Sequence, residues 1–153
     1  MIKIDVTDRE ILKLLQENAR LTIKEIAKKL NLSTTPIFDR MKKLENNGII
    51  DRYVALVNPK KVGKKLTVFI NISIKEHSKS GVEEFVSAII DFPEVLECHH
   101  VTGDADFILK MIFSDIEEYN RFILDSLSII PNIGKVESRF SLSMRKSTTA
   151  IPV

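Results

Sequence analysis

The stretch from residue 22 to residue 44, TIKEIAKKLNLSTTPIFDRMKKL, constrains this chain most, because it predicts two short helices joined by a tight polar turn. Thr22 and Glu25 have the spacing of a capping box, in which each side chain bonds the other residue's backbone N–H at a helix start. Asn31 suits the left-handed residue that ends a helix. This pattern is typical of a helix-turn-helix, whose second helix lies in a DNA groove.

The second helix of this stretch also has recognisable limits. Pro36 falls in its first turn, where the missing N–H costs nothing, and Gly48 marks its end. Phe38 is expected beside the apolar residues that face the core. Those core residues have i, i+4, i+7 spacing and are Ile37, Met41 and Leu44.

The helix start and its polar faces supply the candidate DNA contacts. Hydroxyls and N–H groups at the helix N-terminus suit phosphates, and Arg40 and Lys43 suit base edges or phosphates. Asp39 would repel phosphate, so it either orients Arg40 or Lys43 or accepts from a cytosine amino group. The predicted DNA-binding residues are Ser33, Thr34, Thr35, Pro36, Asp39, Arg40, Lys42 and Lys43. The alternative is a small helical bundle with a solvated basic face.

The charge distribution favours two domains with different partners. Residues 1–65 hold 15 Lys and Arg against 8 Asp and Glu, a net +7, whereas residues 66–153 hold 8 against 13, a net −5. A basic first part indicates a polyanionic partner. We expect a helix-turn-helix domain over 1–50, a hinge strand and linker over 51–65, a second domain over 66–146, and a tail over 147–153.

The first helix is expected over about 8–18, because Thr7 and Glu10 have capping-box spacing. Alternating residues predict a strand over 50–59, which Asn58 and Pro59 would end.

Residues 66–146 predict a βαββαβ order, the split arrangement of a ferredoxin-like fold, so the fold class is α+β. Strands are expected from alternation at 66–74, 95–101 and 107–113. Capping boxes at Ser80–Glu83 and Ser114–Glu117 predict the two helices. A fourth strand has one face made of Val136, Ser138, Phe140, Leu142 and Met144.

The turn TGDAD at 102–106 is a candidate ligand site. A Gly103 turn exposes backbone N–H groups to a carboxylate, and Asp104 or Asp106 suits an ammonium, so together they suit a zwitterion. The alternative is a hairpin turn with no ligand. One face of the sheet has a mixed surface suited to a second subunit, made of Thr67, Phe69, Asn71, Ser73, Lys110, Arg139 and Ser141.

Cys98, His99 and His100 do not predict a metal site. On a strand, Cys98 and His100 share one face and His99 points away, and two ligands are too few for zinc. We expect no cofactor and no catalytic residues, since the chain has no evident nucleophile–base pair or phosphate-binding motif. A lone cysteine and the absence of any long apolar run predict a soluble intracellular protein.

With these motifs in place, the chain resembles the Lrp/AsnC (feast/famine) family of transcriptional regulators over about residues 4–146. The resemblance rests on DREILKLLQENAR (8–20), LSTTPIFDRMKKLENNGII (32–50) and ECHHVTGDADFILK (97–110). It implies a cytoplasmic regulator that binds double-stranded DNA sequence-specifically and that, as many members do, senses an amino acid or a related small molecule. It also implies dimers, often octamers or other multiples of dimers, with effector sites commonly between dimers.

The resemblance also implies site residues. Ser33, Thr35, Pro36 and Arg40 match the recognition-helix motif, and the effector-loop motif is matched by Gly103, Asp104 and Asp106. Two other classes stay open. One is an enzyme similar to siroheme decarboxylases, with His99 or His100 as the first suspects, and the other is an architectural protein that wraps DNA.

Overall fold

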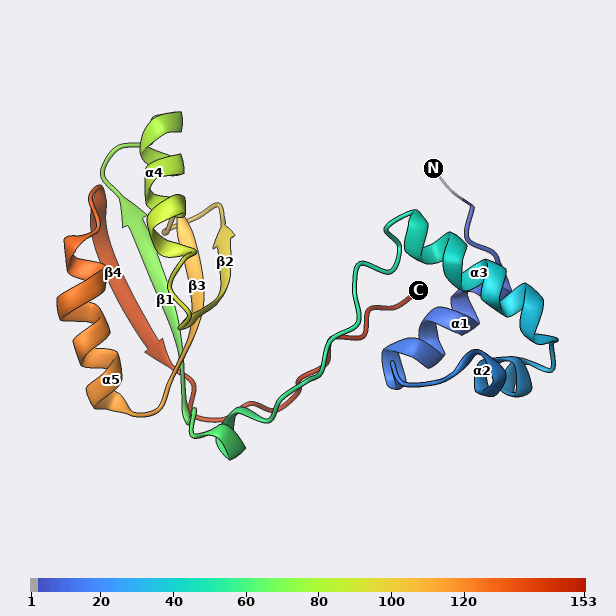
Figure 1. Cartoon of the computed structure of the whole chain (residues 1–153). Coiled ribbons are helices and arrows are strands. Elements are labelled where there is room, and N and C mark those ends of the chain that lie inside the picture. The colour runs from blue at the N-terminus through green and yellow to red at the C-terminus, as the bar shows by residue number, and fades with distance from the viewer. Residues whose placement is uncertain (1–2) are drawn as a thin grey trace. The chain divides into compact units, whose positions relative to one another are not determined.

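The computed structural model describes residues 3–153, which form two compact units (Figure 1). The first unit contains the described residues up to Leu56 together with Lys146–Val153, and the second is Val57–Arg145. The C-terminal tail therefore belongs to the N-terminal unit. The expected domain limits treated it as a separate segment.

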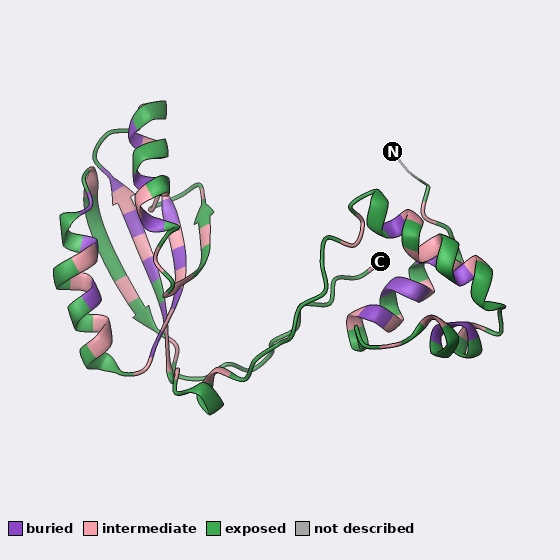
Figure 2. Cartoon of the chain, viewed as in Figure 1, coloured by how far each residue is buried: buried purple, intermediate pink, exposed green. Residues whose placement is uncertain are grey.

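The first unit is built on three helices, α1 (Val6–Glu17), α2 (Ile23–Leu30) and α3 (Thr34–Asn46). Their inward aliphatic residues make one small core, which Figure 2 marks as the buried positions of these helices. Burial of this apolar surface holds the helices together, since helices this short are marginal alone. The core residues are Ile11, Leu12, Leu15, Ile26, Ala27, Ile37 and Leu44.

The caps of these helices agree in part with the sequence. The capping box of Thr22 and Glu25 and the left-handed Asn31 (φ 54°) are confirmed. The capping box expected at Thr7 is wrong, because Asp5 caps α1 and forms the box with Asp8. Two overlapping capping-box patterns, Asp5–Asp8 and Thr7–Glu10, are possible here. The pattern that forms, Asp5–Asp8, places Asp8 where α3 can contact it.

The C-terminal tail contacts α1. The side-chain amide of Gln16 exchanges two hydrogen bonds with the backbone of Ile151, 3.1 Å from Nε2 to the carbonyl and 2.7 Å from the Ile151 N–H to Oε1. Val153 packs against the helical core. The tail is thus held by the Gln16 side chain, which bonds its backbone, and by the packing of Val153; the tail sequence contains no periodic signal for these contacts.

Residues 51–58 are extended and exposed along their whole length. The strand predicted at 50–59 is wrong for this chain, because no described segment pairs with it. Alternating residues favour extended backbone, but a strand also needs a partner. Pro59–Val62 then forms one turn of 3₁₀ helix, which Gly63 ends.

The second unit has the predicted βαββαβ order. Its elements are β1 (Leu66–Ile74), α4 (Lys79–Ile89), β2 (Val95–His100), β3 (Phe107–Phe113), α5 (Ile116–Arg121) and β4 (Ile133–Phe140). A π-helical turn, Phe122–Ser126, and a 3₁₀ turn, Leu127–Ile129, continue α5. The sheet is antiparallel with strand order β2-β3-β1-β4. The α+β fold class and ferredoxin-like arrangement are confirmed.

Helices α4 and α5 cover one face of this sheet (Figure 1), and the other face is open. The central strands β1 and β3 carry most of the buried residues of the sheet (Figure 2). Phe85 and Ile89 of α4 and Phe122 behind α5 pack on them. The packed core between the sheet and the two helices therefore lies directly behind the open face.

Local limits in this unit differ from prediction. Ser78 and Asp115 cap the two helices, in place of Ser80 and Ser114. The fourth strand ends at Phe140, so Leu142 and Met144 lie outside it and are exposed. Phe140 is the last residue of β4 in register with β1, opposite Val68, and one more backbone bond follows, from the Ser141 N–H to the Thr67 carbonyl.

Candidate nucleic-acid interface and effector pocket

The turn between α2 and α3 presents the start of α3 to solvent. Asn31 turns the chain, the Leu32 N–H donates to the Ala27 carbonyl at 3.0 Å, and Ser33 begins α3 in extended conformation. Among the described residues, the Ser33 hydroxyl makes no capping hydrogen bond. Thr34 and Thr35 are exposed. The start of α3 is therefore exposed to solvent, as a phosphate-binding helix end would be.

Arg40 and Lys43 are engaged within the unit. Arg40 Nη1 lies 2.5 Å from an Asp5 oxygen and 2.7 Å from Asp8 Oδ1, and Lys43 Nζ lies 3.0 Å from Asp8 Oδ2. The Asp8 side chain is completely buried. Asp5 and Asp8, and not Asp39, therefore orient these two cations. The buried Asp8 carboxylate needs such charged partners, because burying an unpaired charge is costly.

These contacts also change the protonation behaviour of the cluster. Burial raises the pKa of Asp8, but hydrogen bonds from Arg40 and Lys43 outweigh it, so this pKa lies below its ordinary value. The pKa of Asp5 is lowered by the backbone N–H of Asp8 and by Arg40. Arg40 in turn has a raised pKa, chiefly because of Asp5. The cluster is charged at neutral pH and holds α3 against α1.

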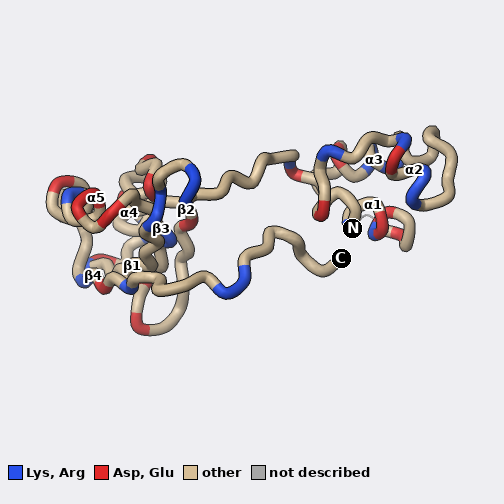
Figure 3. The backbone as a smooth tube through the Cα atoms, turned by 90° about the horizontal axis from the view of Figure 1, so that it is seen from below, with Lys and Arg blue, Asp and Glu red and all other residues tan. Residues whose placement is uncertain are grey.

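The exposed part of α3 therefore has a different composition from the one expected. Asp39 and Lys42 are exposed, and Phe38 is 41% exposed, so the expectation that Phe38 packs beside the core is wrong. Lys42 Nζ lies 4.5 Å from the centre of the Phe38 ring. Lys24, Lys28 and Lys29 add exposed cations from α2, and Figure 3 marks the basic positions of α2 and α3.

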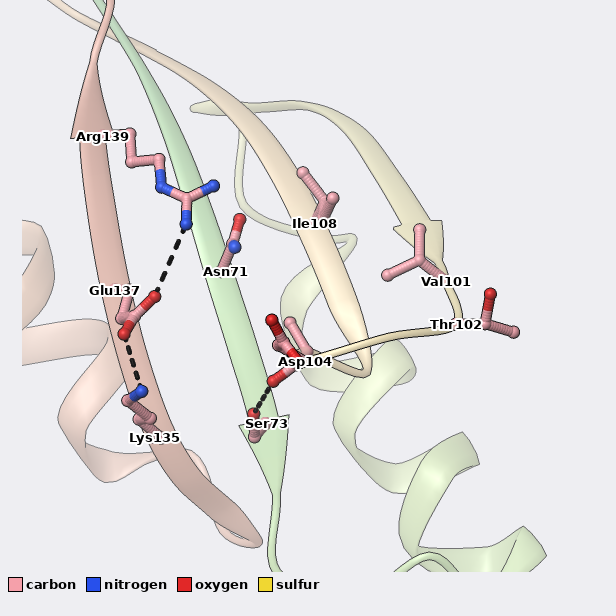
Figure 4. Close-up of a pocket in the computed structure, with 10 residues that line it drawn as sticks. Asn71, Ser73, Val101, Thr102, Asp104, Ile108, Lys135, Glu137 and Arg139 are labelled. Atoms are coloured by element: carbon pink, nitrogen blue, oxygen red, sulfur yellow. Dashed lines mark hydrogen bonds and ion pairs between the residues drawn. The ribbon is translucent and has the colours of Figure 1, made fainter.

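A cavity of about 520 Å³ opens on the uncovered face of the sheet (Figure 4). Its walls come from β1, β3, β4 and the loop between β2 and β3. The lining residues are Asn71, Ser73, Val101, Thr102, Asp104, Ala105, Ile108, Lys135, Glu137 and Arg139. Gly103 lies in the same loop at φ 122°, a backbone angle that favours glycine.

Both signs of charge meet in this cavity. Glu137 lies 2.6 Å from Lys135 and 3.7 Å from Arg139 on the same strand, and Lys135 lowers the pKa of Glu137. Asp104 lies across the cavity, where its carbonyl accepts a hydrogen bond from the Ser73 hydroxyl at 3.4 Å (Figure 4). Arg139 is largely exposed, so its guanidinium has donors left for a ligand.

Asp106 has a different position from the one its predicted role needs. One carboxylate oxygen accepts from the Ile74 N–H at 2.9 Å, and the other lies 2.9 Å from His77 Nε2. Its backbone N–H donates to the Ile72 carbonyl. The bond from Ile74 is the main cause of the lowered Asp106 pKa. Asp106 thus ties the loop to the end of β1 and does not line the cavity.

The sequence had marked three of the cavity residues without assigning them to a ligand. Asn71, Ser73 and Arg139 were expected on a mixed sheet face suited to another subunit. Lys135 and Glu137 were missed. Strand alternation places Glu137 and Arg139 on one face, but only the pairing of β4 with β1 brings them opposite Asn71 and Phe69.

The Cys98–His100 segment has the predicted alternation. Cys98 is half-buried, and burial raises its pKa. His100 stacks on Phe107 with ring centres 4.7 Å apart, and His99 contacts Glu97 on the opposite face. Within residues 3–153, no group of three or more His, Cys, Asp or Glu is arranged to hold a metal ion. In the same range, no helix is long and apolar enough to cross a membrane.

Known families match both parts of the chain. A winged helix-turn-helix DNA-binding model matches residues 4–51, and the Lrp/AsnC ligand binding domain matches residues 67–151. The activator DecR of Escherichia coli K12, described as DNA-binding, is 34% identical over 98% of this chain and 99% of its own. The regulator AzlB of Bacillus subtilis is 35% identical over 99% and 97% of the two chains.

Solved structures agree as well. The regulator NMB0573 of Neisseria meningitidis, in complex with L-Met, has a TM-score of 0.94 and 38% identity, covering 98% of this chain and 97% of that one. E. coli AsnC has a TM-score of 0.90 and 28% identity over 97% and 99% of the chains.

The fold and its exposed helix α3 thus define a DNA-binding transcriptional regulator, not an enzyme. The chain belongs to the Lrp/AsnC family. The siroheme-decarboxylase-like alternative is set aside, because the curated relatives are transcriptional regulators.

Proposed function

We propose that this regulator senses a free amino acid, which binds in the cavity on the open face of the sheet. The observation that carries the proposal is the pairing of opposite charges around one cavity, with Asp104 and Glu137 as acids and Lys135 and Arg139 as bases. A zwitterion needs both signs a few ångströms apart, whereas a simple anion or cation needs one. The cavity size suits a small ligand.

The roles within the cavity follow from the chemistry of its walls. Asp104 takes the ammonium group, and the exposed donors of Arg139 take the carboxylate. Backbone N–H groups at the Gly103 turn add donors for the carboxylate. Asp106 positions the loop through Ile74 and does not contact the ligand. The L-Met complex of the Neisseria regulator supports an amino acid as the ligand class.

DNA is held by the exposed start of α3. Ser33, Thr34 and Thr35 contact phosphates with Pro36 in the first turn, and Lys42 adds a cation. Asp39 is exposed beside them and suits a cytosine amino group. Arg40 and Lys43 act indirectly, because their bonds to Asp8 fix the orientation of α3.

We further propose that the chain acts as a homodimer, and as an octamer or another multiple of dimers, in the cytoplasm. The extended segment 51–58 exposes unpaired backbone and apolar side chains that a second copy can cover. The open sheet face exposes Phe69 beside the cavity strands. Ligand binding near that face would favour one assembly over another and so change the spacing of α3 helices on DNA.

A thermal-shift screen of the full chain over the amino acids tests the ligand. A ligand bound by the native protein at 100 times its Kd adds about 2.7 kcal/mol of stability, which raises Tm by several degrees. Arg139→Ala should remove that rise, whereas Arg145→Ala, an exposed arginine outside the cavity, should keep it. A rise that survives Arg139→Ala would place the ligand elsewhere.

A further inference from the structure

Phe38 lies on the exposed side of α3 and forms one wall of a second cavity. This cavity has a volume of about 340 Å³ and is lined by Ile23, Lys24, Thr34, Thr35 and Phe38. Its walls therefore come from the first turn of α2 and the first two turns of α3. In a helix-turn-helix these are the ends that face DNA.

The cavity is apolar inside and basic at its edge. Ile23 and the Phe38 ring supply its apolar walls, Thr34 and Thr35 add methyl groups, and Lys24 adds a cation. Lys42 Nζ lies over the Phe38 ring at 4.5 Å, which favours a fixed ring orientation. The described residues that line the cavity include no carboxylate. An apolar cavity with cations at its edge suits an apolar group that belongs to a polyanionic molecule.

Arginine is the side chain that most often contacts base edges, but the arginine of this helix is already bonded within the protein. Arg40, the only arginine in the α3 sequence, is bonded to Asp5 and Asp8, and Lys43 is bonded to Asp8. A bidentate contact from Arg40 to guanine would leave the buried Asp8 carboxylate with Lys43 as its one charged partner. Base discrimination by this helix then falls to other exposed side chains, among which Asp39 is polar and Phe38 apolar.

Resting on the DNA-binding function of the chain, we propose that Phe38 determines operator specificity by an apolar contact with a thymine 5-methyl group. In the major groove this methyl is the only apolar feature that distinguishes a base pair, and phenylalanine is among the side chains that contact it. The methyl fits between Phe38 and the Thr34 and Thr35 methyl groups while Lys24 and Lys42 face phosphates. Single exposed aromatics are common on proteins, but this one shares an apolar cavity at the DNA-facing ends of two helices.

The test replaces thymine by uracil, which removes only the methyl group. The full chain is used to select a binding site from random duplexes, and each thymine of that site is then changed singly to uracil. At one position in each half-site, the change from thymine to uracil should lower the affinity of the wild type about fourfold. This is the factor in Kd that corresponds to burying one methyl-sized group. Phe38→Ala should bind both forms of that position equally, and Phe38→Leu should keep part of the difference.

Phe140→Ala is the matched control, because Phe140 is 41% exposed, as Phe38 is, and lies in the other unit. It should keep the wild-type ratio between thymine and uracil sites. The inference is overturned if no thymine shows a methyl effect, if Phe38→Ala keeps the full effect, or if no sequence is selected. The effector proposal fails separately, since it predicts that an amino acid changes binding to the unmodified site whatever the uracil scan shows.

Discussion

The buried carboxylate of Asp8 in α1 accepts a hydrogen bond from the guanidinium of Arg40 in α3 at 2.7 Å. Lys43, one turn further along α3, contacts the other oxygen of the same carboxylate at 3.0 Å. One buried acid thus holds the DNA-facing helix at two points. We propose that its role is to fix the angle at which α3 is presented, while neighbouring residues contact DNA.

Arg40→Ala should destabilise the first unit. It leaves a fully buried carboxylate with one charged partner instead of two, and breaking a buried pair costs about 3 kcal/mol. Arg9→Ala, an exposed arginine of α1, should cost no more than about 0.5 kcal/mol. Urea denaturation followed by circular dichroism measures both. An Arg40→Ala protein that unfolds like the wild type but loses DNA affinity would return Arg40 to the base-reading role.

Lys24→Ala should weaken binding to all DNA sequences by a similar factor. Lys24 is exposed at the start of α2, where it can neutralise a phosphate. The slope of log Kobs against log salt should fall in magnitude by about 1. Fluorescence anisotropy at several salt concentrations gives this slope. Lys13→Ala is the control, because Lys13 pairs with Glu10 on α1. An unchanged slope would remove Lys24 from the interface.

Asp104→Ala and Asp106→Ala should have opposite consequences. Asp104 lines the cavity, so its loss should abolish the amino-acid-induced rise in Tm and leave the ligand-free Tm nearly unchanged. Asp106 bonds the Ile74 N–H, so its loss leaves that buried donor unpaired and should cost about 1–3 kcal/mol without ligand. Differential scanning fluorimetry with and without ligand separates the two. The opposite result would make Asp106 the ligand contact.

Acid should remove a contribution that Glu118 makes to stability. A hydrogen bond from Lys64, aided by the Ser114 N–H, lowers the Glu118 pKa to about 2 from 4.5. Because the folded state holds the proton less tightly than the unfolded state, the contribution is complete above pH 4.5 and is lost as the pH falls towards about 2. The gap in Tm between wild type and Glu118→Gln should be constant above that window and close within it. A gap that does not narrow would show that Glu118 does not titrate there.

Gln16→Ala should release the C-terminal tail from α1. It removes both hydrogen bonds to the Ile151 backbone, each of which contributes about 1 kcal/mol. Amide exchange at Ile151 should accelerate markedly in the variant, as hydrogen–deuterium exchange would show. Gln16 is the only glutamine of the chain, so Glu17→Ala, its exposed neighbour, serves as the control. Equal exchange in wild type and Gln16→Ala would mean that other contacts hold the tail.

The local patterns of the sequence determined the elements and their order. Periodicity at Ile37, Met41 and Leu44 and alternation along 66–74 and 107–113 predicted helices and strands that the structure contains, because these patterns record which face of an element is buried. The α+β class followed from that order. Helix starts were less certain, since overlapping Ser, Thr and Asp caps at each start have similar energies.

Tertiary structure alone decided which residues meet. Asp8 and Arg40 are 32 residues apart, and Ser73, Asp104 and Arg139 come from three distant segments, so their contacts depend on how helices pack and strands pair. The same packing exposed Phe38 and paired Arg40 with the buried carboxylate of Asp8. Residue type predicted that this surface meets DNA. The three-dimensional arrangement of α1 against α3 decided which of its side chains remain free to do so.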